Sequence, residues 1–228
     1  MSGDATARAG RFITLEGGEG VGKSTQARHL AARLEDAGIA VCVTREPGGS
    51  AFAERLRNVL LEAGSARPDP MAEALTFYAA RADHLAETIR PALASGAWVI
   101  CDRFHDSTRV YQGLAGGVDA ATLDKLDALV VAPMFPDCTL ILDLSAEDSI
   151  RRMTERRNAS GDASGPADMF EAGDLAYHQA LRDGFNAVAA AHSARCVTID
   201  ARPRADIVAD AIWSALVQRY PDDERLAH

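Results

Sequence analysis

The feature that most constrains the fold is a glycine-rich octapeptide near the start of the chain. Residues 17–24 read Gly-Gly-Glu-Gly-Val-Gly-Lys-Ser and match the pattern G-x-x-x-x-G-K-[ST] in full. A strand-like run, 11–16, precedes the octapeptide, and a run with helical spacing of apolar residues follows it. In this context backbone N–H groups and a helix N-terminus converge, which favours binding of nucleotide phosphates. The residues expected at the nucleotide are Gly17, Gly18, Glu19, Gly20, Val21, Gly22, Lys23, Ser24 and Thr25.

Two side chains of this loop have specific expected roles. Lys23 is expected to reach the β and γ phosphates, and the Ser24 hydroxyl is expected to bind Mg²⁺. GTPases, ATPases and kinases all contain such a loop, so it predicts binding of a nucleoside triphosphate without identifying the reaction.

The rest of the chain alternates strand-like and helix-like segments. This order predicts an α/β fold with a five-stranded parallel sheet, flanked by helices on both faces, of the P-loop NTPase type. We expect one domain over residues 11–220, a disordered tail over 1–10 and a frayed tail over 221–228. A segment rich in Gly, Ser and Asp at 158–173 predicts a mobile loop, and with the residues before it a short lid over about 156–173. The expected strands are 11–16, 39–44, 98–101, 140–144 and 196–200.

Composition excludes several classes of protein. The formal net charge of −9 is unsuited to sequence-independent binding of a nucleic acid polymer. The chain has neither an apolar run of transmembrane length nor an N-terminal signal pattern, so no membrane association is expected. Four cysteines in short apolar runs, without metal-binding spacing, predict free thiols and a cytoplasmic location.

Polar clusters follow the second and third predicted strands, and another lies within a predicted helix. They read T-R-E-P-G-G at 44–49, D-R-F-H-D-S-T at 102–108 with Y-Q-G at 111–113, and F-Y-A-A-R at 77–81. Together with E-G-x-E-G-x-G-K-S-T at the glycine-rich loop, this ordered set resembles the thymidylate kinase family from about residue 11 to 220. The resemblance implies transfer of a phosphoryl group from ATP to dTMP, with Mg²⁺ as cofactor and a homodimer as the assembly.

The resemblance also implies roles for matching residues. Asp102 would act near Mg²⁺ with Ser24, Arg45 and Arg103 would hold the acceptor phosphate, and Phe77 would stack on thymine. His105 is expected to be an exposed loop residue without a special role. The implied dTMP-binding residues are Arg45, Glu46, Phe77, Arg81, Arg103, Ser107, Tyr111 and Gln112.

The sequence departs from the family pattern after the lid. The variable positions of the glycine-rich loop carry no basic residue, so the resemblance predicts that arginines at the lid supply the missing charge. Where the family often has D-R-[FYI]-E, this chain has Asp168-Met169-Phe170-Glu171, with Met in place of Arg. The expected catalytic residues are Lys23, Asp102, Arg103, Arg156 and Arg157.

Three alternatives remain at this stage. Another P-loop nucleotide kinase or a deoxynucleoside kinase is possible, although a kinase acting on an uncharged sugar hydroxyl has less need of Arg45 and Arg103. A GTPase-like switch should contain the guanine-reading N-K-x-D, which this sequence lacks. An inactive nucleotide-binding relative is favoured only by Met169.

Overall fold

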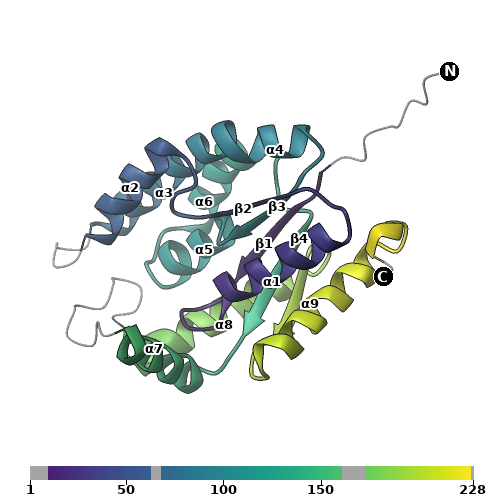
Figure 1. Cartoon of the computed structure of the whole chain (residues 1–228). Coiled ribbons are helices and arrows are strands. Elements are labelled where there is room, and N and C mark those ends of the chain that lie inside the picture. Colours follow the sequence, from purple (N-terminus) through teal and green to yellow (C-terminus); the bar gives the residue numbers. More distant parts are fainter. Residues whose placement is uncertain (1–9, 63–67, 161–172, 227–228) are drawn as a thin grey trace.

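The fold is built on a five-stranded parallel sheet in the order β2-β3-β1-β4-β5 (Figure 1). The structure is a computed structural model that describes residues 10–62, 68–160 and 173–226. The predicted fold class is confirmed, with each strand within two residues of its expected position at either end. The strands are β1 (Phe12–Glu16), β2 (Val41–Arg45), β3 (Trp98–Asp102), β4 (Cys138–Asp143) and β5 (Cys196–Asp200).

Alternating side chains of the strands pack into separate cores on the two faces of the sheet. Ile13 and Leu15 of β1 face the core that helices α1 (Lys23–Asp36) and α9 (Ala205–Arg219) cover. Phe12, which directly precedes Ile13 in the strand, faces the opposite core. Because the three inner strands are buried on both faces, their sequences read as nearly continuous apolar runs. The two edge strands, β2 and β5, are partly exposed instead.

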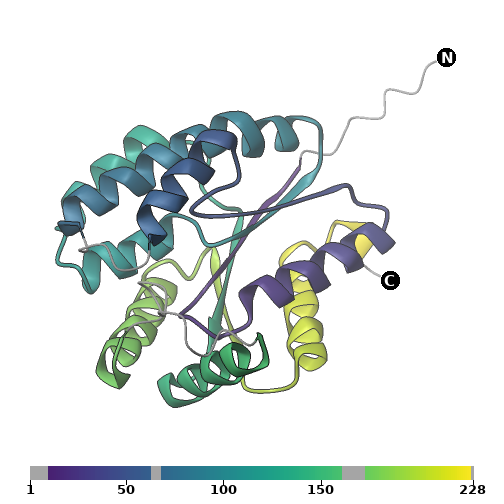
Figure 2. The same ribbon diagram turned by 60° about the vertical axis from the view of Figure 1, so that its left-hand side comes forward.

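The second face of the sheet carries most of the helices (Figures 1 and 2). Near β3 they form a layer with α2 packed on its outer side, and α8 covers β4 and β5. α7 packs against α8 beside the glycine-rich loop. These elements are α2 (Ala51–Leu61), α3 (Pro70–His84), η1 (Leu85–Ile89), α4 (Arg90–Ala94), α5 (His105–Thr108), η2 (Arg109–Leu114), α6 (Ala120–Leu126), η3 (Asp127–Val131), α7 (Ala146–Ser160) and α8 (Leu175–Ala191).

Local sequence signals begin and end several helices. Ser50 caps α2 by accepting from the backbone N–H of Ala53, and Ser145 caps α7 by accepting from the N–H of Asp148. Pro91 lacks an N–H inside the long helix predicted for 71–95. The helix widens there into the π-helical turn η1 between α3 and α4, which accommodates the missing hydrogen bond.

Two segments differ from the sequence predictions. Residues 105–114 form a continuous helical segment, α5 and η2, although the sequence pattern indicates only a motif after a strand. The segment 221–226, expected to be frayed, contains the short helix η4 (Glu224–Leu226) and packs Leu226 into the core beside α9. Within the described part of the chain, none of the helices is both long and apolar enough to cross a bilayer.

Candidate active site

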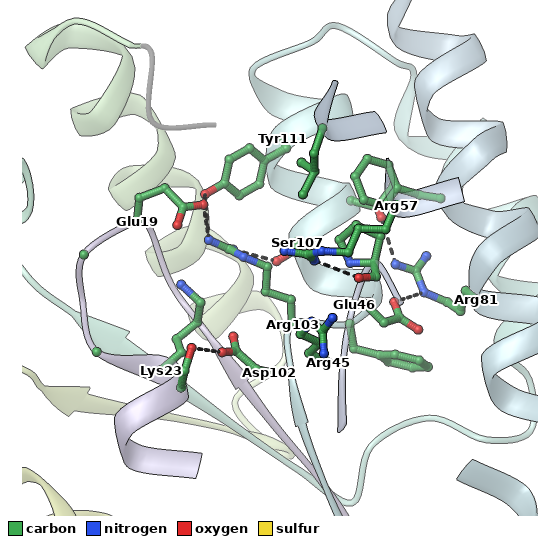
Figure 3. A pocket seen from close by; sticks show the side chains of 18 of the residues that line it. Glu19, Lys23, Arg45, Glu46, Arg57, Arg81, Asp102, Arg103, Ser107 and Tyr111 are labelled. Carbon is green, nitrogen blue, oxygen red and sulfur yellow. Dashed lines mark hydrogen bonds and ion pairs between the residues drawn. The ribbon is translucent and has the colours of Figure 1, made fainter. Parts of the chain in front are cut away.

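The carboxyl ends of β1, β2 and β3 open into one cavity of about 390 Å³ (Figure 3). The predicted residues come together there from six separate segments of the chain. Those that line the cavity are Glu19, Gly20, Gly22, Lys23, Ser24, Thr25, Arg45, Glu46, Phe77, Arg81, Asp102, Arg103, Ser107, Tyr111, Gln112 and Arg156. Gly17, Gly18 and Val21 instead line a smaller neighbouring cavity against β4.

The glycine-rich loop has the backbone that its sequence predicts. Gly17 has φ +131°, and a Cβ there would lie 2.6 Å from the carbonyl oxygen of Leu142, so only glycine fits. The Lys23 ammonium folds back on the loop and donates to the carbonyl oxygens of Gly17 at 3.1 Å and Gly18 at 2.6 Å. Burial, together with the charge of Arg103, lowers the pKa of Lys23 to about 8. The ammonium is therefore preorganised beside the position expected for the transferred phosphate.

Ser24 and Asp102 meet at the start of α1. The Ser24 hydroxyl donates to Oδ2 of Asp102 over 2.5 Å, joining the end of β3 to the glycine-rich loop. Both are oxygen ligands of the kind that Mg²⁺ prefers, and Mg²⁺ usually takes one or two carboxylates and completes its shell with phosphate oxygens and water. Within the described ranges, no cluster of three or more His, Cys, Asp or Glu side chains could hold a metal alone. The residues therefore fit a metal that is bound jointly with a nucleotide.

Arg103 joins the glycine-rich loop to the acceptor side of the cavity. It has φ +70°, an uncommon conformation for a residue with a side chain. Its guanidinium donates to the carbonyl of Gly17, to the hydroxyls of Ser107 and Tyr111, and to the carboxylate of Glu19. Burial opposes ionisation of Glu19, but Arg103 and Lys23 outweigh it and lower the pKa of Glu19 to about 2. This side of the cavity thus holds a fixed carboxylate between two cations.

A second arginine, Arg81, lies across the cavity and is almost completely buried. Its Nε donates to Oε2 of Glu46 at 2.8 Å, and its Nη2 donates to the hydroxyl of Thr108 at 3.0 Å. Its remaining nitrogen, Nη1, is buried and has no hydrogen-bond partner among the described residues, and neither has Nε2 of Gln112. Because an unpaired buried donor is costly, two such groups on one cavity indicate a polar ligand that accepts from them.

Two arginines near the end of β2 add positive charge to the mouth of the cavity. Arg45 is half exposed and pairs with Glu54 of α2 at 3.0 Å. Arg57, also on α2, donates to the carbonyl of Pro47 at 2.8 Å and lines the cavity. Arg57 is not among the predicted residues because no motif contains it, and α2 brings it to the cavity only through its packing. The other lining residues missed are Arg28, Pro47, Leu61, Phe104 and Thr108.

A buried carboxyl group lies directly behind the cavity wall. Glu16 at the end of β1 accepts from the backbone N–H of Phe104 at 2.8 Å and from the hydroxyl of Ser107 at 2.6 Å. Burial and the negative charge of Asp106 raise the pKa of Glu16 to about 7. Glu16 therefore holds the loop between β3 and α5. The only indication of this role in the sequence is that Glu16 directly precedes the glycine-rich loop.

The expectation for His105 is wrong. His105 is 1% exposed and lies in α5 rather than in an exposed loop. Its Nδ1 is 3.2 Å from Oδ2 of Asp127, and its Nε2 is 3.6 Å from Oδ2 of Asp106. Asp127 also accepts from the hydroxyl of Tyr78 at 2.7 Å. Because the neighbouring aspartates come from different elements, sequence spacing could not reveal this buried network.

The two predicted lid arginines occupy different positions on α7. Arg156 lines the cavity, and its charge acts on Glu19, whereas Arg157 is half-buried and is not among the lining residues. The segment with Met169 in place of the expected Arg lies outside the described residues. Arg156 is therefore the arginine of this pair that the structure brings to the site.

Comparison with known proteins agrees with this geometry. A sequence model described as thymidylate kinase matches residues 15–212. The chain is 48% identical over 215 residues to a thymidylate kinase of Nitrobacter winogradskyi, covering 94% of this chain and 91% of the relative. It is 47% identical over 222 residues to one from Bradyrhizobium diazoefficiens, covering 96% and 95%. A crystal structure of thymidylate kinase from Ehrlichia chaffeensis matches with a TM-score of 0.72 and 34% identity, over 91% of this chain and 98% of that one.

Proposed function

Because the chain belongs to the thymidylate kinase family and phosphorylates dTMP to dTDP with ATP, we propose that the described cavity holds the reacting ends of both substrates. The glycine-rich loop then binds the phosphates of ATP, and the cavity beyond it takes dTMP. The arrangement of the residues supports this division, since Lys23 lies on the loop and Arg81 and Gln112 lie across the cavity from it.

The acceptor nucleotide is held at three places in this proposal. Arg45 and Arg103 bind its phosphate, with Arg57 as an additional cation at the mouth. Phe77 stacks on thymine, and Arg81 and Gln112 face the polar edge of the base. Glu46 orients Arg81, and Ser107 and Tyr111 complete the wall through their contacts with Arg103.

The reaction needs alignment and neutralisation of charge more than covalent help. A phosphate oxygen of dTMP is already anionic at neutral pH, so no strong general base is required to activate it. Lys23, Arg103 and Arg156 all line the cavity and place positive charge near the transferred group. Ser24 and Asp102 hold Mg²⁺, which when bound neutralises charge on the phosphates of ATP. Arg157 adds charge only through a movement of α7 that brings it to the cavity.

The observation that carries this assignment is the pair of buried, unpartnered donors, Nη1 of Arg81 and Nε2 of Gln112, on the acceptor side. The variant Gln112→Met preserves length and removes the amide. We expect its affinity for dTMP, measured by calorimetry, to fall about tenfold, since a lost hydrogen bond to a buried group costs about 1–3 kcal/mol, while its affinity for ATP stays unchanged. Gln218→Met on the exposed side of α9 is the matched control. Equal dTMP affinity in both variants would remove Gln112 from the acceptor site.

Assembly and location complete the proposal. We propose a homodimer, supported by exposed apolar side chains on the outer layer of helices at Phe52, Val59 and Leu75, with Leu129 on η3 nearby in the same layer. The molar mass in solution from light scattering tests it, and a monomer at micromolar concentration would contradict it. We also propose a cytoplasmic location, which the four free cysteines support because such thiols persist in a reducing compartment.

A further inference from the structure

Behind Arg81 lies a chain of hydrogen bonds that leads away from the cavity. Oε1 of Glu46 is 3.1 Å from Nδ1 of His84, and Nε2 of His84 is 2.7 Å from the hydroxyl oxygen of Thr44. A carboxylate only accepts, so Nδ1 of His84 carries a proton and donates to Glu46. Thr44 and Glu46 lie at the end of β2, whereas His84 and Arg81 lie one turn apart on α3. These hydrogen bonds therefore join the end of β2 to α3 at the point where Arg81 enters the cavity wall.

The side chains that form this series of hydrogen bonds are buried and tightly enclosed. The side chains of His84, Glu46 and Arg81 are 0%, 4% and 1% exposed. The loop after β2 closes over the imidazole at Gly49, which has φ +87°. A Cβ at Gly49 would lie 2.3 Å from Nε2 of His84 and 2.5 Å from Oγ1 of Thr44. Any side chain at position 49 would therefore collide with the imidazole, so the glycine backbone packs directly against the ring.

The orientation of the Arg81 guanidinium depends on this enclosure. Glu46 holds its Nε and Thr108 holds its Nη2, while the rings of Tyr78 and Phe104 lie 4.8 Å and 5.2 Å from its central carbon. His84 holds the second oxygen of the Glu46 carboxylate, so loss of His84 frees that carboxylate to rotate. The planar guanidinium would then turn with it, and Nη1 would no longer point in one direction.

We propose that His84 is a positioning residue for base selection, which acts on dTMP through Glu46 and Arg81. The inference rests on the proposed role of Arg81 as the donor to the base. A fixed donor pairs with the carbonyl of thymine and repels the amino group that cytosine has in its place. A donor that can turn away discriminates less, because it no longer penalises the wrong base. His84 thus controls which pyrimidine monophosphate reacts rather than the rate of the reaction.

Two substitutions of His84 test its two hydrogen bonds, to Glu46 and to Thr44, one at a time. Asn places an amide nitrogen near the position of Nδ1 and keeps the contact with Glu46, whereas Gln reaches toward Thr44 and loses Glu46. For His84→Gln we expect the ratio of kcat/KM for dTMP over dCMP to fall about tenfold or more, mainly through a higher KM for dTMP. The kcat with dTMP and the KM for ATP should stay within about twofold, and His84→Asn should keep the ratio within about threefold.

Arg81→Lys keeps a charge beside Glu46 but removes the planar fork, and it separates the two parts of the argument. We expect Arg81→Lys to lose discrimination between dTMP and dCMP, and the addition of His84→Gln to lower the ratio by less than about twofold further. This result supports the view that His84 acts through Arg81. If Arg81→Lys discriminates as the wild type does, the proposed base reading is wrong and the role of His84 falls with it. If Arg81→Lys loses discrimination and His84→Gln keeps it, only the role of His84 is refuted.

A milder pair decides the question if the His84 variants do not fold. Thr44→Val removes the outer hydrogen bond to His84. Thr88→Val removes a hydroxyl that donates to the carbonyl of Gly49 at 2.6 Å in the same loop, whereas the ring of His84 has its hydrogen bond with Thr44. We expect the dTMP-over-dCMP ratio to fall about threefold in Thr44→Val and to stay unchanged in Thr88→Val. An equal loss in both, or none in Thr44→Val, overturns the proposal.

Discussion

A buried ion pair that connects the residue before β5 to α5 gives a quantitative test of the structure. Arg195, directly before β5, donates from Nη1 and Nη2 to the two carboxylate oxygens of Asp106, each over 2.7 Å. The side chains of Arg195 and Asp106 are 16% and 0% exposed. Asp106 lies on α5 between Arg103 and Ser107, so the pair anchors the segment that carries both cavity residues. The perturbation we consider is Arg195→Met.

The expected cost follows from the burial of Asp106. Removing one partner of a buried pair costs about 3–5 kcal/mol, because the remaining charge is left without compensation. Arg195 is partly exposed and His105 stays 3.6 Å from Asp106, so we expect the lower end of this range, about 3 kcal/mol. For a chain of this length, that loss corresponds to a fall in Tm of roughly 6–12 °C.

Urea unfolding and thermal denaturation of the wild type and Arg195→Met measure this loss directly. The variant Asp106→Asn in the Arg195→Met background removes the uncompensated charge, and it should restore at least half of the lost free energy of unfolding. A loss below about 1 kcal/mol in Arg195→Met, the range of an exposed pair, would refute the reasoning. So would a double variant that loses as much free energy of unfolding as Arg195→Met and Asp106→Asn lose when each is measured alone and the two losses are added.

Three further results are expected. Asp102→Asn should lower kcat about a hundredfold or more and raise the Mg²⁺ concentration for half-maximal rate, in a magnesium titration at saturating substrates; an unchanged Mg²⁺ requirement would remove Asp102 from the metal site. Burial raises the pKa of Glu16 to about 7, so between about pH 4.5 and 7 the folded protein keeps a proton that the unfolded chain has released. Protonation of Glu16 therefore stabilises the fold at low pH, and this contribution to the free energy of unfolding, on the order of 3 kcal/mol, is lost as the pH rises from about 4.5 through 7. The variant Glu16→Gln should flatten that decline in urea unfolding at pH 5 to 8, and parallel curves would contradict the pKa. The double variant Arg156→Ala, Arg157→Ala should lose about a hundredfold in kcat, and a loss within about threefold in a steady-state assay would rule out a charge contact in the transition state.

The sequence predicts the parts of the site that are continuous in the chain. The glycine-rich loop follows a strand and precedes a helix, so its phosphate-binding geometry needs no knowledge of the remaining fold. The positions of Asp102 and Arg103 follow equally well from the apolar run before them, because parallel strands end at one edge of the sheet. The hydrogen bonds from Ser24 to Asp102 and from Arg103 to Glu19 require in addition that β3 lies beside β1, and this strand order comes from the structure.

The parts that could not be predicted depend on contacts between distant segments. Glu16 and His105 are ordinary polar residues in the sequence. Glu16 becomes buried where Phe104 and Ser107 cover the end of β1, and His105 becomes buried where α5 meets Asp127 of η3. Arg57 reaches the cavity because α2 lies beside the loop after β2, which no local pattern indicates. His84 lies in a segment with helical spacing of apolar residues, but its hydrogen-bond partners, Thr44 and Glu46, are 40 and 38 residues away in the sequence. Contacts over such separations cannot be recognised from patterns among neighbouring residues.

We propose that the part of the cavity opposite the glycine-rich loop selects dTMP through a fixed arginine donor. ADP release by the purified protein with ATP and Mg²⁺ measures this selection, with dTMP, dUMP, dCMP and AMP offered separately as acceptors. We predict fast turnover with dTMP, weaker turnover with dUMP, which has the same carbonyl but no methyl group, and little with dCMP or AMP. Turnover with dCMP or AMP equal to that with dTMP would contradict it.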